Sequence, residues 1–533
     1  MNPRRRLAQV SFSALVLGAI LPPASAVAAA GSCLGFQSTH SGDNASDGTI
    51  QGTDDADVID GSGGTYTINA LGGDDLVCGG AGDDTINGGP GTDAIDGGDG
   101  KDTINGDDND DLIFSGLGDD VIDGGPSDSG GDWIYFYDIL GSVTVDLERG
   151  SSRQSTGETD DLNNLENVYG SPGHDTIFGD DAANYLVGWE GNDLIGARNG
   201  DDVVNGMAGN DAMFGGGGLN DWLVYFDADG PVTADLQTGE ATVGFNGSEP
   251  GRDGLSGFES LSGSDHDDFL YGDAGKNYLA GADGEDTLDG RDGFDTAMFY
   301  RAVVANLRHG KGTSWKTVTP PRGDEPYQVA VIDTLLGLEG LWGSPDWDTL
   351  IGDGANNLLR GDAASDDIRG AGGQDYFIHE DDVDQENDAG STSGGKGSYD
   401  LADYSLSPDR LNIDLVSGLN DLGGQLVGVE GLRGSDRRDV FTGNDLANFF
   451  FGGGGDDVLR GKHGRDGLAG GEGVDKLAGG RASDRCIEGE QISGCEKLAS
   501  PKHHPLTSIA GSMSRPAALE AGAVGPEEGR RYK

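Results

Sequence analysis

The sequence predicts an all-β solenoid built from short stacked turns. A nine-residue unit recurs in one register, as in GGAGDDTIN, GGPGTDAID and GGDGKDTIN between residues 79 and 105. The first half of the unit is rich in Gly, and its eighth place is a β-branched apolar residue throughout the first run of units. A fixed period of this kind is the signature of a repeat architecture, in which each unit stacks on its neighbours.

Each half of the nonapeptide has its own structural role. Gly at the start of the unit lets the backbone adopt positive φ and turn tightly. The following residues can then extend, and alternate side chains of an extended segment point to opposite faces. We therefore expect the eighth residue to point inward and its two neighbours to point outward. One inward side chain per unit makes no core alone, so several units must stack. In residues 52–123 these inward residues are Ile59, Ile68, Val77, Ile86, Ile95, Ile104, Ile113 and Ile122.

The sixth place of the unit is acidic, and Tyr66 is the exception within residues 52–123. Stacking places these carboxylates in rows at the turns, where they repel one another. Calcium would relieve the repulsion, because this hard cation takes about six to eight oxygen ligands and binds both carboxylates and turn carbonyls. The sequence therefore predicts multiple Ca²⁺ sites. The sixth-place residues of this first block are Asp57, Asp75, Asp84, Asp93, Asp102, Asp111 and Asp120.

The repeat returns in four later blocks, at 170–214, 263–298, 343–378 and 434–487. The second unit of each later block carries Asn at the sixth place, at Asn184, Asn277, Asn357 and Asn448. An amide oxygen is neutral, so we expect weaker calcium ligation in these units. The other predicted metal ligands of the later blocks are Asp175, Asp193, Asp202, Asp211, Asp268, Asp286, Asp295, Asp348, Asp366, Asp375, Asp439, Asp457, Asp466, Asp475 and Asp484.

Spacers that resemble one another separate the blocks. Segments such as DWIYFYD at Asp132 and DWLVYFD at Asp221 continue the register, and VTVDL, VTADL, VVANL and LNIDL alternate in the manner of strands. The predicted parts are a signal segment (1–30), a leading segment (31–51), the first block (52–131), three spacer-plus-repeat parts (132–214, 215–298 and 299–378), a loop with spacer and terminal block (379–497), and a disordered tail without periodicity (498–533).

The nonapeptides resemble the glycine-rich repeats of the repeats-in-toxin (RTX) family, also called hemolysin-type calcium-binding repeats. The resemblance covers roughly residues 50 to 490. It implies a right-handed parallel β-roll in which calcium lies between turns and is held by the sixth-place Asp and by turn carbonyls. The arrangement of repeats between Cys residues also resembles exported RTX-like proteins of high-GC Gram-positive bacteria.

The first 30 residues have the features of a secretory signal. Arg4, Arg5 and Arg6 precede the uncharged run VSFSALVLGAIL, and small residues typical of a signal-peptidase site follow. The run is too short to span a membrane, and no longer apolar run occurs later in the sequence. We therefore expect a secreted, extracellular protein without a transmembrane span, and either the Sec or the twin-arginine route fits.

The four Cys residues predict two disulfides. An even number of Cys in an exported chain favours disulfide bonds over free thiols. Cys33 and Cys78 lie near the start of the patterned region, and Cys486 and Cys495 lie at its end. Pairing of near neighbours predicts the bonds Cys33–Cys78 and Cys486–Cys495, with four free thiols as the alternative.

Charge and motifs restrict the function. The 94 acidic and 34 basic residues give a formal net charge of −60, which argues against a nucleic-acid partner. The sequence contains no HExxH, GxSxG or Walker-type motif, and no non-repetitive stretch long enough for a catalytic domain. We predict no enzyme activity, and a polysaccharide-modifying enzyme is the less favoured alternative.

The favoured prediction is an exported calcium-binding protein with a structural or interaction role at or outside the cell surface. The alternative is a calcium-dependent adhesin or glycan-binding protein with cell-surface glycans or proteins as partners. Trp133, Trp222 and Trp342 motivate that alternative, because they recur in the spacers and an exposed Trp can stack on sugars.

Overall fold

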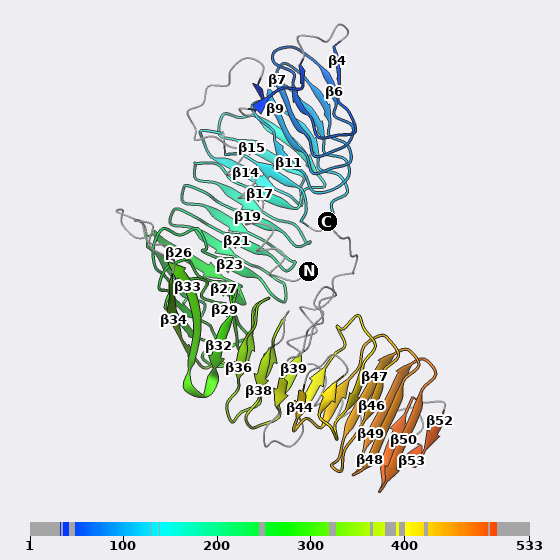
Figure 1. Ribbon diagram of the computed structural model, residues 1–533. Coiled ribbons are helices and arrows are strands. Elements are labelled where there is room, and N and C mark those ends of the chain that lie inside the picture. Colours follow the sequence, from blue (N-terminus) through cyan, green and yellow to red (C-terminus); the bar gives the residue numbers. More distant parts are fainter. Residues whose placement is uncertain are drawn as a thin grey trace. The chain divides into compact units, whose positions relative to one another are not determined.

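The computed structural model describes residues 32–33, 36–41, 48–128, 130–137, 139–244, 251–318, 327–362, 366–378, 391–393, 400–420, 425–488 and 491–497 (Figure 1). The predicted signal segment and the predicted disordered tail lie outside these residues. The fold is all-β, as predicted, and the strands of the repeat blocks begin at or near the seventh place of the nonapeptide.

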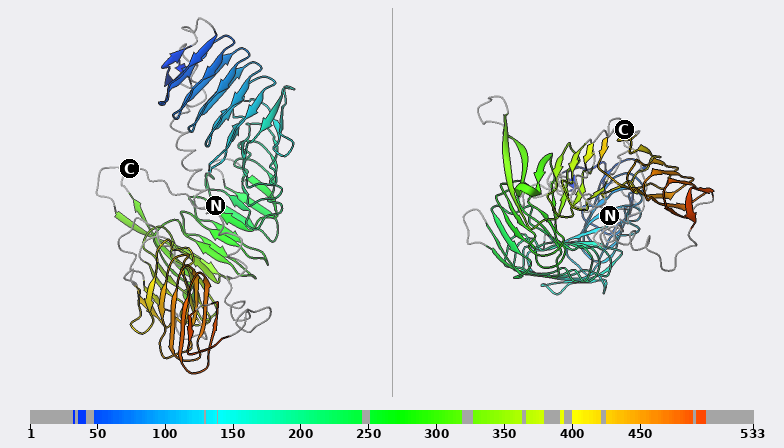
Figure 2. Two further views of the ribbon diagram at one scale, coloured as in Figure 1. Left: turned by 90° about the vertical axis from the view of Figure 1, so that its right-hand side faces the viewer. Right: turned by 90° about the horizontal axis from the view of Figure 1, so that it is seen from below.

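Two nonapeptides make one coil of the solenoid. β8 (Thr85–Asn87) pairs in parallel with β10 (Thr103–Asn105), so that Ile86 lies opposite Ile104 in the next coil. The pairing partner is 18 residues away, which is two repeat units. Successive units therefore contribute strands alternately to two parallel sheets, sheet I and sheet II, and Figure 2 shows the strands of the first block as successive rungs.

The described chain divides into two compact units, unit 1 up to residue 229 together with 238–260, and unit 2 with 230–237 and the residues from 261 onward. In unit 1, sheet I consists of β3 (His40–Ser41), β5 (Val58–Asp60), β7 (Leu76–Ala81), β9 (Ala94–Asp99), β11 (Leu112–Phe114), β13 (Trp133–Tyr135), β17 (Asn167–Tyr169), β19 (Tyr185–Val187), β21 (Val203–Asn205) and β23 (Trp222–Val224).

Sheet II of unit 1 contains β8 and β10 with β4 (Thr49–Gln51), β6 (Thr67–Asn69), β12 (Val121–Asp123), β14 (Val143–Asp146), β15 (Ser151–Gln154), β16 (Thr159–Asn163), β18 (Thr176–Phe178), β20 (Leu194–Gly196), β22 (Ala212–Phe214), β25 (Glu240–Val243) and β26 (Gly251–Ser256). A short antiparallel pair, β1 (Ser32–Cys33) with β2 (Phe36–Gln37), precedes the stack. β27 (Ser260–Ser262) spans the division between the units.

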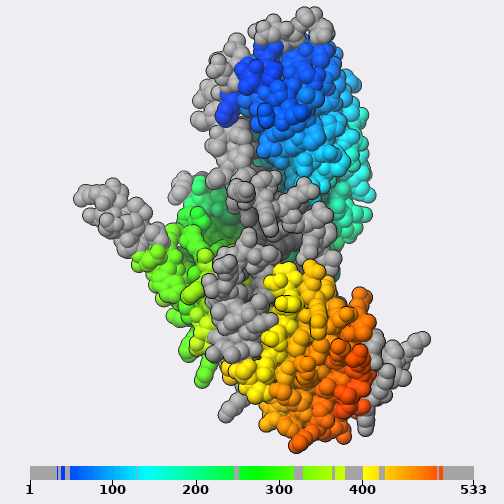
Figure 3. Space-filling view, turned by 45° about the vertical axis from the view of Figure 1, so that its right-hand side comes forward, coloured from blue at the N-terminus to red at the C-terminus, as the bar shows by residue number. Residues whose placement is uncertain are grey.

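Unit 2 repeats the arrangement, and Figure 3 shows its last block, in orange, as a closely packed stack. Its sheet I contains β29 (Tyr278–Ala280), β31 (Thr296–Met298), β35 (Gly340–Trp342), β37 (Leu358–Arg360), β39 (Tyr376–Ile378), β41 (Leu401–Asp403), β45 (Gly431–Arg433), β47 (Phe449–Gly454), β49 (Gly467–Glu472), β51 (Asp484–Ile487) and β53 (Cys495–Lys497).

Sheet II of unit 2 contains β24 (Val232–Asp235), β28 (Phe269–Tyr271), β30 (Thr287–Asp289), β32 (Val303–Asn306), β33 (Lys311–Val318), β34 (Tyr327–Leu336), β36 (Thr349–Ile351), β38 (Asp367–Arg369), β40 (Ser391–Ser393), β42 (Asn412–Asp414), β43 (Leu419–Asn420), β44 (Gln425–Val427), β46 (Val440–Thr442), β48 (Val458–His463), β50 (Lys476–Arg481) and β52 (Gln491–Ser493). A single turn of 3-10 helix, η2 (Leu307–His309), follows β32.

Spacers enter the solenoid as antiparallel insertions in sheet II. β12 pairs in parallel with β16, which pairs with β15 and then β14 in antiparallel fashion, and β14 returns to parallel pairing with β18. β30, β34, β33, β32 and β36 repeat the same order in unit 2. The sequence correctly indicates the strands that begin at Val143, Val232, Val303 and near Leu411, but it does not indicate the hairpin that each of them forms or enters.

The core lies between the two sheets and consists of the eighth-place side chains. Ile59, Ile86 and Ile95 are completely buried, and the later blocks continue the row with residues such as Leu270 and Phe450. The expectation that the eighth place points inward is therefore confirmed. Burial of one large apolar side chain contributes about 1.5–3 kcal/mol, so the core strengthens with each added unit.

On the outer face of sheet I, some of the outward-pointing neighbours of the inward residue are also buried. Trp133 and Tyr135 flank Ile134 and are both buried. Tyr135 and Tyr169 of neighbouring coils stack with 5.3 Å between their ring centres, and Trp133 lies 5.2 Å from the ring centre of Tyr185, two coils away. Parallel pairing in register places equivalent side chains of neighbouring coils side by side, so aromatic residues at equivalent places stack.

Both predicted disulfides are present. Cys33 bonds to Cys78, which links the leading segment to β7, and Cys486 bonds to Cys495, which links β51 to β53. No helix among the described residues is long and apolar enough to cross a membrane.

We expect substitution of the inward Ile104 by Ala to destabilise the calcium-loaded protein by about 2–5 kcal/mol, because the shortened side chain leaves a cavity between the sheets. Thr103 is exposed on the outer face of the same strand, so Thr103→Ala is the matched control with an expected cost below about 1 kcal/mol. Urea unfolding followed by circular dichroism gives both values. Equal costs for the two variants would contradict the assignment of the core.

Candidate metal sites in the turns

Sixth-place carboxylates form a ladder along each side of the solenoid. Oδ1 of Asp93 accepts a hydrogen bond of 2.8 Å from the backbone N–H of Asp75, one coil earlier, and Oδ1 of Asp111 accepts one of 2.9 Å from the N–H of Asp93. On the opposite side, Asp102 and Asp120 continue an equivalent ladder that starts at Asp84. Every predicted Asp ligand is buried.

The second carboxylate oxygen has no such donor in most of these residues. A buried acceptor without a partner costs free energy, and most buried polar atoms in proteins are satisfied. Among the described residues, Oδ2 is buried without a hydrogen-bond partner in Asp75, Asp84, Asp93, Asp102, Asp111, Asp120, Asp132, Asp193, Asp211, Asp221, Asp286, Asp295, Asp375, Asp400, Asp457, Asp466 and Asp484. Such a row of open oxygens indicates a missing partner of positive charge.

Burial also raises the pKa of these carboxyls. Desolvation is the largest cause, hydrogen bonding to backbone N–H groups opposes it, and neighbouring carboxylates add to it. The pKa rises to about 6 for Asp84, to about 7 for Asp93 and to about 9 for Asp111. The charged form of these side chains is therefore costly in the metal-free fold, and a bound cation would stabilise it.

Backbone carbonyls lie beside the open carboxylate oxygens. A Cβ placed on Gly79, at the first place of its unit, would lie 2.5 Å from the carbonyl oxygen of Gly97 and 2.8 Å from Oδ2 of Asp84. Both distances are too short for a side chain, so Gly is required here. The same crowding brings a carbonyl of the next coil close to the carboxylate, and two types of oxygen ligand converge at one place.

These oxygens fit the requirements of calcium. No group of three or more His, Cys, Asp or Glu side chains gathers as a metal site among the described residues. A metal site in the turns must therefore be completed by backbone carbonyls. Calcium takes about six to eight oxygens, including carbonyls, in flexible geometry, whereas transition metals prefer nitrogen or sulfur ligands. The donor set therefore favours calcium over zinc or copper.

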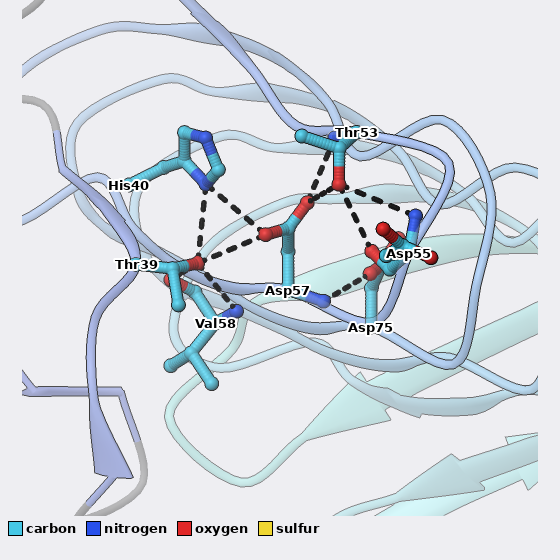
Figure 4. A network of polar contacts seen from close by, with 7 residues as sticks. All are labelled: Thr39, His40, Thr53, Asp55, Asp57, Val58 and Asp75. Carbon is cyan, nitrogen blue, oxygen red and sulfur yellow. Dashed lines mark hydrogen bonds and ion pairs between the residues drawn. The ribbon is translucent and has the colours of Figure 1, made fainter.

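The first Asp of each block is an exception, because a hydroxyl residue four places earlier satisfies it. The backbone N–H of Thr53 donates to Oδ2 of Asp57 over 2.7 Å, and the Thr53 hydroxyl donates to the same atom (Figure 4). Burial alone would raise the pKa of Asp57, but hydrogen bonds from Thr53 and Thr39 outweigh it and lower the pKa. The Asp57 carboxylate therefore needs no cation at that oxygen, whereas burial still raises the pKa of Asp175 and Asp268 to about 6.

Later blocks begin in the same way. The backbone N–H of Ser171 donates to Oδ2 of Asp175 over 2.6 Å, and the Ser171 hydroxyl donates to Oδ1 over 2.7 Å. The corresponding pairs are Ser264 with Asp268, Ser344 with Asp348 and Ser435 with Asp439. The predicted ligands Asp57, Asp175, Asp268, Asp348 and Asp439 thus have hydrogen-bond donors at both oxygens.

Asn at the second unit has a local role of its own. Oδ1 of Asn184 accepts a hydrogen bond of 2.7 Å from the N–H of Asp180, and its Nδ2 donates to the carbonyl oxygen of Glu166. Oδ1 of Asn277, Asn357 and Asn448 is held in the same way. The neutral amide is satisfied by these hydrogen bonds, and weaker calcium ligation in these units stays a prediction.

Several acidic residues of the ladder are not among the ligands predicted from the sequence. Asp132, Asp221 and Asp400 open spacers and carry the same open Oδ2 as the repeat ligands. The unbroken register of the spacers is the signal that could have identified them. Glu residues continue the ladder where the spacers rejoin the blocks, through hydrogen bonds from Asp132, Asp221, Asp295 and Asp400 to Glu166, Glu259, Glu339 and Glu430.

A family model described as the RTX calcium-binding nonapeptide repeat matches the chain repeatedly. The matched residues are 69–104, 96–129, 166–195, 197–221, 262–297, 342–377, 433–468, 442–477 and 451–486. They include parts of all five repeat blocks and the starts of two spacers. A search of curated proteins finds no match.

We expect Asp93→Asn to remove at least one bound calcium ion and to raise the calcium concentration at the folding midpoint. Oδ2 of Asp93 is buried without a hydrogen-bond donor, and the neutral amide of Asn would be a weaker calcium ligand than the carboxylate. Asp175→Asn should leave the number of bound ions unchanged, since Ser171 already serves that carboxylate. Metal analysis of the dialysed protein measures both. Equal loss of calcium in the two variants would contradict the distinction between open and satisfied carboxylates.

Raised pKa values predict that protons partly replace calcium. The pKa of Asp111 and Asp286 is about 9 in the metal-free fold, well above the ordinary value of 3.8 that applies in the unfolded chain. The fold then binds more protons than the unfolded chain, so its stability is greatest at acidic pH and falls as the pH rises through these values. With calcium chelated, circular dichroism should show more β-structure at about pH 5 than at about pH 8.

The variant Asp93→Asn, Asp111→Asn, Asp286→Asn is the control for this pH dependence, because it lacks three of the titrating groups. It should lose part of the difference between the two pH values. A chelated parent protein with equal β-structure at both values, or with more at the alkaline one, would contradict the prediction.

Proposed function

We propose that this chain, an RTX calcium-binding nonapeptide-repeat protein, is an exported scaffold whose fold is organised by calcium. The observation that carries the proposal is the row of buried carboxylate oxygens without donors at the turns. Calcium at these positions would supply the missing positive charge and would join neighbouring coils. Metal binding then contributes directly to the free energy of folding.

The charge of the whole chain supports this proposal. A formal net charge of −60 is spread over 533 residues, and many of the carboxylates lie in rows one coil apart. Such self-repulsion opposes the compact state. The opposing core provides one inward side chain per nonapeptide. Divalent ions bound along the rows would neutralise much of this repulsion, and the chain would remain expanded without them.

Export is supported by the predicted signal segment and by the disulfides. Disulfide bonds persist in oxidising compartments and are rare in the cytosol, and the structure pairs all four Cys residues. Calcium sites of extracellular modules work at about 10⁻⁴–10⁻³ M, a concentration that the cytosol does not reach. On this proposal the chain folds only after it has left the cell.

The proposed role is structural or interactive rather than catalytic. The alternative of glycan binding through Trp133, Trp222 and Trp342 receives no support from their positions. Their exposed fractions are 8%, 2% and 8%, so their rings are packed within the fold and present little surface to a sugar. Among the described residues the most exposed Trp is Trp347, at 74%.

Calcium titration of the chain without its first 30 residues tests the proposal. We expect a metal-free chain with little β-structure and a cooperative gain of β signal at about 10⁻⁴–10⁻³ M calcium. Magnesium should substitute poorly, because it demands a smaller octahedral shell. Circular dichroism follows the transition. A full β signal in excess chelator would show that calcium is not the organiser of the fold.

A further inference from the structure

Basic residues occupy an unfavourable backbone position at three equivalent points of the chain. The second place of the nonapeptide adopts positive φ, which favours Gly over residues with a Cβ. Arg198, Arg291 and Lys462 nevertheless stand there, with φ of 78°, 69° and 71°. Each belongs to the fourth unit of its block. Other residues with a Cβ also occur at second places, and the three basic ones are distinguished by the contacts that they make.

Arg291 makes that interaction with the end of a spacer strand. Its Nη1 donates to Oδ1 of Asp235 over 2.8 Å and its Nη2 donates to Oδ2 of the same carboxylate over 2.7 Å. Nη1 also donates to the carbonyl oxygen of Gly272 over 2.6 Å. The guanidinium lies over the ring of Tyr271, 5.2 Å from its centre. Planar bidentate pairing with a carboxylate is a strong form of ion pair.

Arg198 repeats this geometry in unit 1. Its Nη2 donates to Oδ1 of Asp146 over 2.8 Å, and its Nη1 donates to the carbonyl oxygen of Gly179. Its Nε lies 3.3 Å from a carboxylate oxygen of Glu148. Lys462 is the weaker case, with 3.7 Å between its ammonium and Oδ1 of Asp414, where both side chains are partly exposed. The three pairs Asp146–Arg198, Asp235–Arg291 and Asp414–Lys462 are the spacer clasps.

Each clasp lies where a spacer leaves the path of the coil. Asp146 ends β14, which pairs with β18, and the chain then turns into the hairpin with β15. The residue after β18 is Gly179, at the first place of the next unit. First-place carbonyls are the groups that lie beside an open carboxylate in an uninterrupted turn, as Gly97 does beside Asp84. Here the first-place carbonyl instead contacts a guanidinium.

The fourth block lacks both partners of the clasp. Its spacer strand ends in Asn306 in place of Asp, and the second place of its fourth unit is Ala371, with φ of 72°. The Asn306 side chain accepts a hydrogen bond from the N–H of His309 at the turn of 3-10 helix. Within one chain, therefore, the acidic and the basic partner occur together three times and are absent together once.

We infer that Arg198 and Arg291, and to a smaller extent Lys462, are resident cations that perform at the spacer junctions the role that calcium performs in uninterrupted turns. Arg198 and Arg291 each place a positive charge between a first-place carbonyl oxygen one coil earlier and a carboxylate two coils earlier. This inference rests on the proposed function, since it assigns which turns take calcium and which take a side chain. The clasped junctions keep their local order without calcium, and the junction between residues 306 and 371 has no such support.

Hydrogen exchange of the full chain tests the clasp. Arg291→Gly is the test variant, and Ala282→Gly is its matched control. Both positions are second places with φ of 69°, so Gly relieves the backbone equally in the two variants. In saturating calcium, Arg291→Gly should speed exchange in β24 and β28 by about tenfold, because a half-buried bidentate pair is lost. Ala282→Gly should leave exchange unchanged or slower. Equal exchange in the two variants would overturn the inference.

Two further measurements distinguish loss of the clasp from general misfolding of the variant. Arg291→Lys retains the charge and should keep part of the protection, and Asn306→Asp with Ala371→Arg should install a fourth clasp and slow exchange in β32 and β36. A loss of bound calcium in Arg291→Gly would also overturn the inference, because a resident cation replaces an ion and supports none. Protection of β7 and β9 in the parent, with and without calcium, tests the proposed function separately.

Discussion

The structure depends on whether each buried carboxylate oxygen at a turn has a hydrogen-bond donor or a cation beside it. One oxygen of the sixth-place Asp accepts a backbone N–H from the preceding coil and fixes the register between coils. The other oxygen is buried beside a first-place Gly and a carbonyl of the next coil. Gly at that place, the spacing of nine and the acidic composition all follow from this single arrangement. A cation completes it, and calcium has the ligand preference that fits.

The chain meets the same requirement in different ways where the repeat is interrupted. Block openings use a Ser or Thr to satisfy the carboxylate, as Thr53 does for Asp57. The second units of the four later blocks replace the carboxylate with Asn. Spacer junctions use the side chain of Arg198 or Arg291 as an internal cation. These devices keep the ladder continuous through insertions that would otherwise leave a charged group buried alone, which is costly in a protein interior.

Much of the fold and of the candidate sites could be predicted from the sequence. The nine-residue register correctly places Ile59 and its equivalents in the core, and it places every predicted Asp at a buried turn. The period alone could not show that Asp57 and Asp175 have donors at both oxygens. The Ser or Thr four residues earlier contacts the carboxylate only through the conformation of the folded turn. It also did not show the hairpins in sheet II, since antiparallel and parallel strands share the same alternation. Burial of Trp133 and Tyr135 depends on stacking between coils, which local sequence does not reveal.

The most direct test of this account is the location of calcium in crystals of the calcium-loaded protein, by anomalous diffraction. The account predicts ions beside Oδ2 of the open carboxylates, such as Asp84, Asp93 and Asp102. It also predicts no ion at the guanidinium groups of Arg198 and Arg291, and none at Oδ2 of Asp57 or Asp175. Ions distributed without regard to these differences, or open carboxylates that remain without a cation in saturating calcium, would contradict it.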